Sequence, residues 1–154
     1  AAFNKEFVGP VKEYPFFQEA VGVEIYNFIP GNVKNYGENV IFDAPIETVL
    51  VDKYELTKFK ADDIVRFKNG FNVKFTQVSE YGAKAQFISY EKREAQTLSW
   101  IKGTSNVEIL MSDGTKKVGV SSTLINEEKK MVRFEGLGYA TNDNANGKFV
   151  FSYE

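Results

Sequence analysis

The feature that most constrains the fold is a turn between two stretches in which apolar and polar residues alternate. Asn69-Gly70 is a residue pair that tolerates positive φ, which a two-residue type I′ hairpin turn requires. The apolar residues that alternate around it are Val65, Phe67, Phe71, Val73 and Phe75. Because side chains on a strand alternate between its two faces, these residues share one face. A second turn at residues 80–82 lets residues 63–90 form a three-stranded antiparallel meander.

The same alternation continues along the chain. Asp113-Gly114 is a second hairpin signal, because alternating residues precede and follow it. Near the end, Phe149, Phe151 and Tyr153 recur at every second position and should therefore share a face. The pattern predicts an all-β fold: an antiparallel meander of about nine or ten strands that forms a β-barrel or a β-sandwich. We find no internal repeat in the sequence.

One segment favours a helix. In residues 91–101, Ala95, Leu98 and Ile101 recur at roughly helical spacing, and the first four residues are good helix formers. We therefore expect at most one short helix, near residues 91–101. The alternative is that residues 96–101 form another strand.

Composition limits the chemistry that the chain can perform. Its 154 residues are enough for one domain with its own core, and its 14 Phe and 8 Tyr favour strands. The absence of cysteine excludes disulfides and thiolate sites. The absence of histidine excludes Ser-His-Asp catalysis and histidine-ligated zinc. These absences predict a protein that is not an enzyme and that holds no cofactor or metal ion.

Charge and hydropathy bear on partners and location. The 19 basic and 21 acidic residues give a net charge of −2, which argues against nucleic acid as a partner. No apolar run approaches the length of a transmembrane helix, so no membrane partner is expected. We see no signal-peptide pattern, and Ala1-Ala2 fits removal of an initiator Met better than a cleaved signal. We expect a virion or cytoplasmic location.

Residues 1–20 are expected to form an aromatic arm ahead of a single β-barrel or β-sandwich domain at residues 21–154. Pro10 and Pro15 disfavour a regular helix or a central strand in the arm. Its aromatic residues are Phe3, Phe7, Tyr14, Phe16 and Phe17. The arm either covers an open edge of its own domain or reaches a neighbouring subunit. In the second case these five residues are the predicted assembly interface.

A polar loop near the end partly matches a calcium-binding loop. Asn142, Asn144 and Asn146 place oxygen atoms at alternate positions ahead of Gly147, as calcium loops do. Such loops also need a glutamate at the twelfth position, which is Tyr153 here. A solvated hairpin loop is the favoured interpretation.

Two further motifs lack features that their chemistry requires. Glu55 and Asp62-Asp63 could supply paired carboxylates, but adjacent residues on an extended chain point to opposite sides. Gly136 and Gly138 lack the third glycine and the following helix of a dinucleotide-binding loop. We interpret the first motif as a surface turn and the second as a bulge or a close backbone approach.

Basic and aromatic residues interleave in and around the meander. The basic residues are Arg66, Lys68, Lys74, Lys84 and Lys92, and the aromatic residues are Phe67, Phe71, Phe75 and Tyr81. A basic groove with aromatic stacking positions is typical of an OB-like protein that binds single-stranded nucleic acid. Here the two sets alternate, so they should face opposite sides of the sheet. A core face backed by a solvated face is therefore the simpler interpretation.

The favoured function is a self-assembling structural subunit, such as a phage tail-tube, head or decoration protein or an injection-tube protein. The aromatic arm, the long polar loops and the β-rich body are the features that favour it, and a homo-oligomer is the expected partner. The first alternative is an up-and-down barrel that carries a small apolar ligand. The second alternative is the OB-like binder of single-stranded nucleic acid.

Overall fold

The computed structural model describes residues 11–123, 125, 131–143 and 147–153. Within these residues the chain forms fourteen β-strands and one short helix, α2 (Lys53–Leu56), so the all-β prediction is confirmed. The chain divides into two compact units. Unit 2 comprises residues 19–102, and unit 1 comprises the residues before and after it. These boundaries differ from those of the expected arm (1–20) and single body (21–154).

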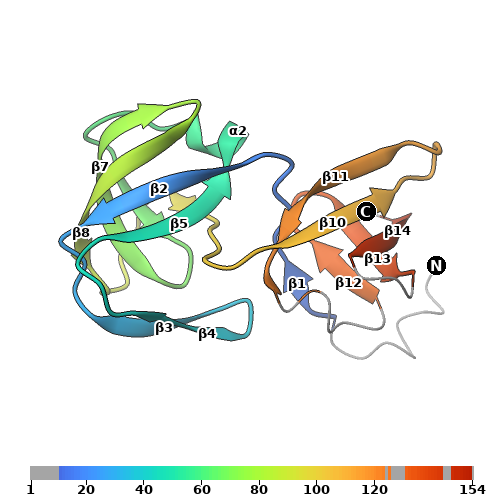
Figure 1. Ribbon diagram of the computed structural model, residues 1–154, viewed down its shortest axis with the longest axis horizontal. Coiled ribbons are helices and arrows are strands. Elements are labelled where there is room, and N and C mark those ends of the chain that lie inside the picture. The colour runs from blue at the N-terminus through green and yellow to red at the C-terminus, as the bar shows by residue number, and fades with distance from the viewer. Residues whose placement is uncertain (1–10, 124, 126–130, 144–146, 154) are drawn as a thin grey trace. The chain divides into compact units, whose positions relative to one another are not determined.

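Unit 2 is built on a six-stranded sheet that curls on itself (Figure 1). In spatial order its strands are β5 (Glu47–Asp52), β2 (Ala20–Tyr26), β8 (Gly82–Ser89), β7 (Phe71–Ser79), β6 (Ile64–Phe67) and β9 (Thr97–Leu98). The predicted meander is β6–β7–β8, and its apolar face is buried as expected. A separate hairpin, β3 (Gly31–Asn35) and β4 (Glu38–Phe42), is inserted between β2 and β5.

The two edges of this sheet meet at one backbone bridge beyond β9. The Ile101 amide donates to the Leu50 carbonyl at 2.9 Å, and the Leu50 amide donates to the Ile101 carbonyl at 2.7 Å. Leu50 lies on β5, the opposite edge strand. The bridge satisfies backbone groups at edges that would otherwise be open to another chain. Unit 2 is therefore a closed barrel rather than a sandwich.

Aromatic rings fill this barrel. Trp100 is fully buried, and its ring centroid lies 5.3 Å from that of Phe71 and 5.8 Å from that of Phe42. The indole Nε1 of Trp100 donates to the Lys68 carbonyl at 2.8 Å. Because Lys68 lies in the β6–β7 turn, this contact fixes the turn against the core. A small barrel has room inside only for side chains, so a carrier cavity is not expected here.

Unit 1 is built on a second six-stranded sheet (Figure 1). In spatial order its strands are β1 (Glu13–Tyr14), β12 (Met131–Phe134), β13 (Gly138–Asn142), β14 (Lys148–Tyr153), β10 (Ser105–Leu110) and β11 (Lys116–Ser121). Its edges also meet at one bridge, where the amides of Phe17 and Val120 each donate to the other residue's carbonyl at 2.9 Å. Phe134 packs edge-on against Phe149 in its core.

The two units have the same strand order. Unit 1 runs β1-β12-β13-β14-β10-β11, and unit 2, taken from its other edge, runs β9-β6-β7-β8-β2-β5. The first and fourth pairings are parallel in both units, and the other three are antiparallel. The prediction of one antiparallel meander without an internal repeat is therefore too simple: one barrel occurs twice.

Short sequences recur at equivalent positions of the two barrels. Val23-Glu24-Ile25 on β2 corresponds to Val107-Glu108-Ile109 on β10. Val65-Arg66-Phe67 on β6 corresponds to Val132-Arg133-Phe134 on β12. The repeats support an internal duplication independently of the strand order.

The short edge strand of each barrel comes from the other half of the chain. β1 leads into β2 of unit 2 but pairs with β12 of unit 1. β9 leads into β10 of unit 1 but pairs with β6 of unit 2. Two tandem copies, β1 to β8 and β9 to β14, have therefore exchanged their first strands, as in domain swapping.

Two local predictions differ from the structure. The short helix lies at Lys53–Leu56, where Asp52 caps its first amides, and not near residues 91–101. Residues 97–98 form β9, as the strand alternative predicted. The β6–β7 turn is a three-residue connection: Phe67 pairs with Phe71, and Asn69 has a φ of +60°. A two-residue type I′ turn at Asn69-Gly70 is therefore wrong.

The described part of the predicted arm lies within unit 1 as far as residue 18, whereas residues 19 and 20 belong to unit 2. Tyr14 on β1 is 1% exposed and Phe17 at the closing bridge is 4% exposed. Phe16 packs edge-on against Phe134 with 5.9 Å between ring centroids. Phe3 and Phe7 lie outside the described residues. A contact of these five residues with a second copy of the chain stays a prediction.

Glu47, at the start of β5, is a carboxyl group that is held by several partners and is expected to make the stability of unit 2 depend on pH. Its carboxylate accepts hydrogen bonds from the Asp43 and Ala44 amides at 2.9 and 3.0 Å and lies 3.2 Å from Lys102 Nζ. Burial raises the pKa of Glu47, but these three partners together lower it more, so its pKa lies below the ordinary value of 4.5.

A carboxyl group with a depressed pKa in the folded state stabilises the fold above its unfolded pKa, and this stabilisation is lost as the pH falls through the folded value. We therefore expect Glu47→Gln to lower the free energy of unfolding at pH 7. The gap between variant and wild type should shrink as the pH falls below about 4.5. Urea unfolding of both proteins between neutral pH and that range measures the gap. A gap that is independent of pH would contradict the assignment.

Candidate functional site

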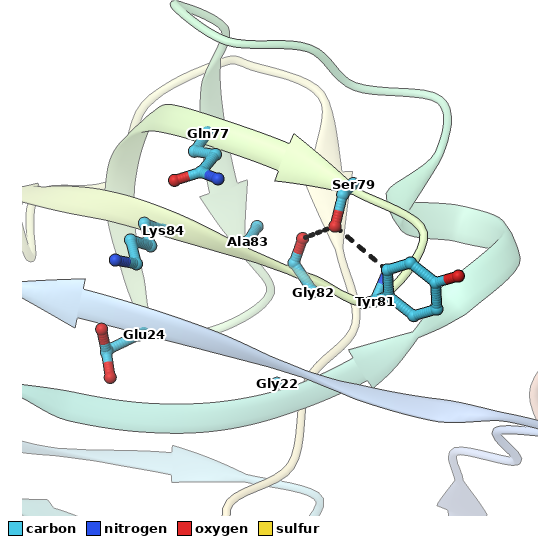
Figure 2. Close-up of a pocket in the computed structure, with 8 residues that line it drawn as sticks. All are labelled: Gly22, Glu24, Gln77, Ser79, Tyr81, Gly82, Ala83 and Lys84. Atoms are coloured by element: carbon cyan, nitrogen blue, oxygen red, sulfur yellow. Dashed lines mark hydrogen bonds between the residues drawn. The ribbon is translucent and has the colours of Figure 1, made fainter.

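A shallow pocket of about 270 Å³ lies on the outer face of the unit 2 sheet, over β2, β8 and β7 (Figure 2). Its floor is bare backbone at Gly22 and Gly82, which are paired on the parallel strands β2 and β8. A Cβ atom on Gly82 would lie 2.6 Å from the Gly22 carbonyl oxygen, and Gly82 has a φ of +147°. Only glycine suits this position, so the floor stays flat.

Charged and polar side chains border one end of this pocket, and an aromatic ring borders the other (Figure 2). Glu24 and Lys84 are register partners on β2 and β8, and Gln77 is paired with Lys84 across β7. Tyr81, in the β7–β8 turn, is 82% exposed. The Tyr26 hydroxyl donates a hydrogen bond to Glu24, which raises the pKa of Tyr26 above its ordinary value. The pocket therefore combines a flat backbone floor with a charged end and an exposed tyrosine ring.

A second position of interest is the arginine that the duplication places in both barrels. In unit 2, the Arg66 guanidinium donates to Asn72 Oδ1 at 3.3 Å and to the carbonyls of Tyr90 and Glu91 at 3.3 and 3.2 Å. The Asn72 side chain is fully buried and donates to Glu91 O at 2.7 Å. These hydrogen bonds from Arg66 therefore hold the segment after β8 on the outer face of the sheet.

The equivalent row in unit 1 has a different composition. Register pairs across β1, β12, β13 and β14 align Glu13, Arg133, Tyr139 and Tyr153. Arg133 forms an ion pair with Glu13, and the two side chains are 42% and 40% exposed. The rings of Tyr139 and Tyr153 are stacked, with centroids 4.7 Å apart and an interplanar angle of 27°. Both tyrosines are only partly buried.

A β-bulge brings Tyr153 to this row. Tyr139 pairs with Tyr153, whereas the next residue, Ala140, pairs with Phe151, so Ser152 is the extra residue. A bulge of this kind re-aims a side chain. Tyr153 therefore lies beside Tyr139 on the outer face, and the prediction that it shares a face with Phe149 and Phe151 is wrong. Unit 2 has a register shift at the equivalent position, between Asn72 and Val73.

The calcium candidate is only partly described. Asn142 ends β13 and Gly147 directly precedes β14, while Asn144 and Asn146 lie outside the described residues. In the ranges that the structure describes, no group of three or more His, Cys, Asp or Glu side chains could hold a metal ion.

The other sequence candidates occupy turns or, for Glu55, the short helix α2. Asp63 Oδ2 accepts from the Lys60 amide at 2.9 Å, and Glu55 forms an ion pair with Lys58, so these carboxylates serve local contacts. Gly136 has a φ of +72° and lies in the β12–β13 hairpin turn rather than in a bulge.

The basic residues of the meander do not form a joint surface with its phenylalanines. Phe67, Phe71 and Phe75 are buried in the barrel, whereas Lys74 and Lys84 are exposed on the outer face. The expected separation of the two faces is confirmed for the phenylalanines, whereas Tyr81 and Lys84 border the same outer pocket. In the part of the chain that the structure describes, no helix is long and apolar enough to cross a membrane.

Curated relatives of this chain include glutamate–tRNA ligases of Pyrococcus and Thermococcus species. The chain is 25% identical to the glutamate–tRNA ligase of Pyrococcus furiosus, with 99% of the chain and 30% of the relative covered. It is 26% identical to the enzyme of Pyrococcus abyssi, with 97% of the chain and 29% of the relative covered. It is 29% identical to the enzyme of Thermococcus onnurineus over 65% of the chain and 19% of the relative.

The chain thus spans between 19% and 30% of the length of these relatives. No family model matches the sequence. The similarity is distant, but in two of the three cases it extends over nearly the whole chain and therefore over both barrels.

These relatives overturn the favoured function. The similarity is to enzymes named for joining glutamate to tRNA, so a self-assembling virion subunit is wrong, and the expected virion location has no support. The similarity to enzymes also weakens the reasoning from missing histidine and cysteine, because a segment without catalytic residues can belong to an enzyme. These relatives support neither the predicted homo-oligomer nor the predicted absence of a nucleic-acid partner.

Proposed function

We propose that this chain is a tRNA-binding part of a protein related to glutamate–tRNA ligases, and that it contributes binding rather than the joining reaction. The observation that carries the proposal is the similarity to such ligases along 97–99% of the chain. The ligases are several times longer, so their other segments can supply the chemistry. Within this chain, the absence of histidine and cysteine leaves few groups suited to acid–base or nucleophilic catalysis.

The physical form of the chain supports recognition of unpaired nucleotides. Sequence-specific recognition of RNA targets single-stranded loops, whose bases can stack on aromatic rings and be read by hydrogen bonds. Two small barrels that expose Tyr81, Tyr139 and Tyr153 on outer faces, near Lys84 and Arg133, offer such groups. A net charge of −2 argues that local surfaces, rather than a general attraction to phosphates, supply the affinity.

Equilibrium binding tests the proposal. The full chain is titrated into fluorescently labelled tRNA specific for glutamate, with another tRNA and a perfect RNA duplex as competitors. We expect saturable binding, competition by the cognate tRNA at least about tenfold better than by the duplex, and loss of affinity with salt that corresponds to only a few phosphate contacts. Absence of saturable binding at low salt, or equal competition by the duplex, would contradict the proposal.

A further inference from the structure

We infer that the row Arg133, Tyr139 and Tyr153 on the outer face of unit 1 is where an unpaired base of the RNA stacks. This inference rests on the proposed function and names the site and the ligand chemistry within it. The row runs across three neighbouring strands, β12, β13 and β14, so its side chains are carried by a rigid sheet. A rigid element positions a binding site more accurately than a loop does.

The two tyrosines make a preformed stacking surface. Their rings are stacked at 4.7 Å between centroids, so each ring restrains the other. The Tyr153 hydroxyl also lies 4.0 Å from the sulfur of Met131, a residue of the neighbouring strand β12. A base that stacks on this pair therefore meets rings that are already ordered, which lowers the entropic cost of binding.

Arg133 adds a cation at the side of the ring pair. It is the register partner of Tyr139, and its side chain is 42% exposed. An arginine guanidinium can stack on a base or donate two hydrogen bonds to a phosphate. Its present partner, Glu13, is itself 40% exposed. Because exposed ion pairs contribute little free energy, a phosphate can replace Glu13 at small cost.

The equivalent row in unit 2 consists of different residues. The exposed tyrosines of unit 1 are therefore not a general feature of this barrel fold. Asn72 and Ser89 stand where Tyr139 and Tyr153 stand in unit 1, and they hydrogen-bond to each other at 3.0 Å. Arg66 there donates to backbone carbonyls of the segment that follows β8. In unit 2 the side chains of the row thus form hydrogen bonds with one another and with the backbone. In unit 1 the row presents two aromatic rings and a partly exposed guanidinium.

The test uses the full chain and a tRNA whose loop bases are replaced one at a time by the fluorescent base 2-aminopurine. Tyr139→Leu and Tyr153→Leu keep an apolar side chain in the strand but remove the ring. Each should weaken tRNA binding by about 5- to 150-fold, the range reported for the loss of one stacked base. Tyr139→Phe, which keeps the ring, should stay within about twofold of wild type. Tyr54→Leu is the matched control, because Tyr54 is 58% exposed on α2 of unit 2.

The 2-aminopurine emission gives a second reading on the wild-type protein. One loop position should be quenched on binding, and the quenching should be reduced in the two leucine variants. Photo-crosslinking of the wild-type complex, mapped by mass spectrometry, should label the β13 or β14 peptide, and this result does not depend on how the variants fold.

Three outcomes separate the inference from the proposed function. If tRNA binds but folded leucine variants bind like wild type, the stacking site is wrong and the proposed function stands. Crosslinks confined to unit 2 would overturn the site in the same way. If the wild-type chain binds no tRNA, the stacking site and the proposed function are both wrong.

Discussion

Replacing Trp100 by alanine lowers the free energy of unfolding of unit 2 by about 3–5 kcal/mol, the range for deleting a large buried aromatic side chain. Trp100 is fully buried, lies within 6 Å of Phe71 and Phe42 between ring centroids, and donates a hydrogen bond to the Lys68 carbonyl in the β6–β7 turn. The alanine variant therefore loses packing and leaves that carbonyl without its indole donor. Urea unfolding followed by far-ultraviolet circular dichroism measures the change.

Trp100→Phe is the matched control for this variant. It retains a ring against Phe71 and Phe42 but cannot donate to Lys68. We expect a loss of about 1–3 kcal/mol, clearly smaller than that of the alanine variant. In nuclear magnetic resonance spectra of Trp100→Ala, the amide signals of β7 in unit 2 should disappear at lower urea concentrations than those of β13 in unit 1. Equal stability of Trp100→Ala and wild type would show that the ring does not organise this barrel.

Gly119→Ala opens the barrel of unit 1 at its closing bridge. Gly119 lies on β11, and a Cβ atom there would come within 2.3 Å of the Phe17 carbonyl oxygen and 3.1 Å of the Gln18 Cα. Both neighbours are backbone atoms, so neither can move aside as a flexible side chain could. The methyl group must displace the segment that exchanges two hydrogen bonds with Val120. We expect a loss of about 2–4 kcal/mol from overpacking together with weakened hydrogen bonds.

Val118→Ala is the control on the same strand, because Val118 is 61% exposed. Its effect should stay within about 0.5 kcal/mol of zero, as for an ordinary surface substitution. Hydrogen exchange at the Val120 amide should accelerate in Gly119→Ala and remain slow in Val118→Ala. Slow exchange at Val120 in both variants would mean that the bridge does not close the barrel.

Period-two alternation was enough to predict the fold class and one meander. Val65, Phe67, Phe71, Val73 and Phe75 are all fully buried, as their spacing indicated. The helix expected near residues 91–101 failed for a tertiary reason. Arg66 and Asn72 bind the carbonyl of Glu91, and β9 pairs with β6, so long-range hydrogen bonds override a local helical preference.

The duplication was detectable in the sequence only through two tripeptides. Val-Glu-Ile and Val-Arg-Phe each occur twice, but unit 2 carries the β3–β4 hairpin between them, so their spacing differs between the copies. The exchange of edge strands further separates β1 and β9 from the barrels they complete. Neither the insertion nor the exchange leaves a periodic signal.

The row of Arg133, Tyr139 and Tyr153 could not be predicted from the sequence, for two reasons. Tyr153 reaches the outer face only because of the bulge at Ser152, and strict alternation places it inside. The net charge of −2 describes the whole chain, whereas nucleic-acid recognition depends on a local surface such as the one that Arg133 borders. The repeated Val-Arg-Phe sequence is the one signal that could have drawn attention to Arg133.

A nuclease footprint on tRNA tests most directly whether this chain recognises unpaired nucleotides. Labelled tRNA specific for glutamate is cleaved with a probe of single-stranded RNA and, separately, with a probe of double-stranded RNA, with and without saturating protein. We predict protection of a few contiguous loop nucleotides, with most of each stem unprotected. Protection confined to the stems, or an unchanged cleavage pattern at saturating protein, would contradict recognition of unpaired tRNA nucleotides by these two barrels.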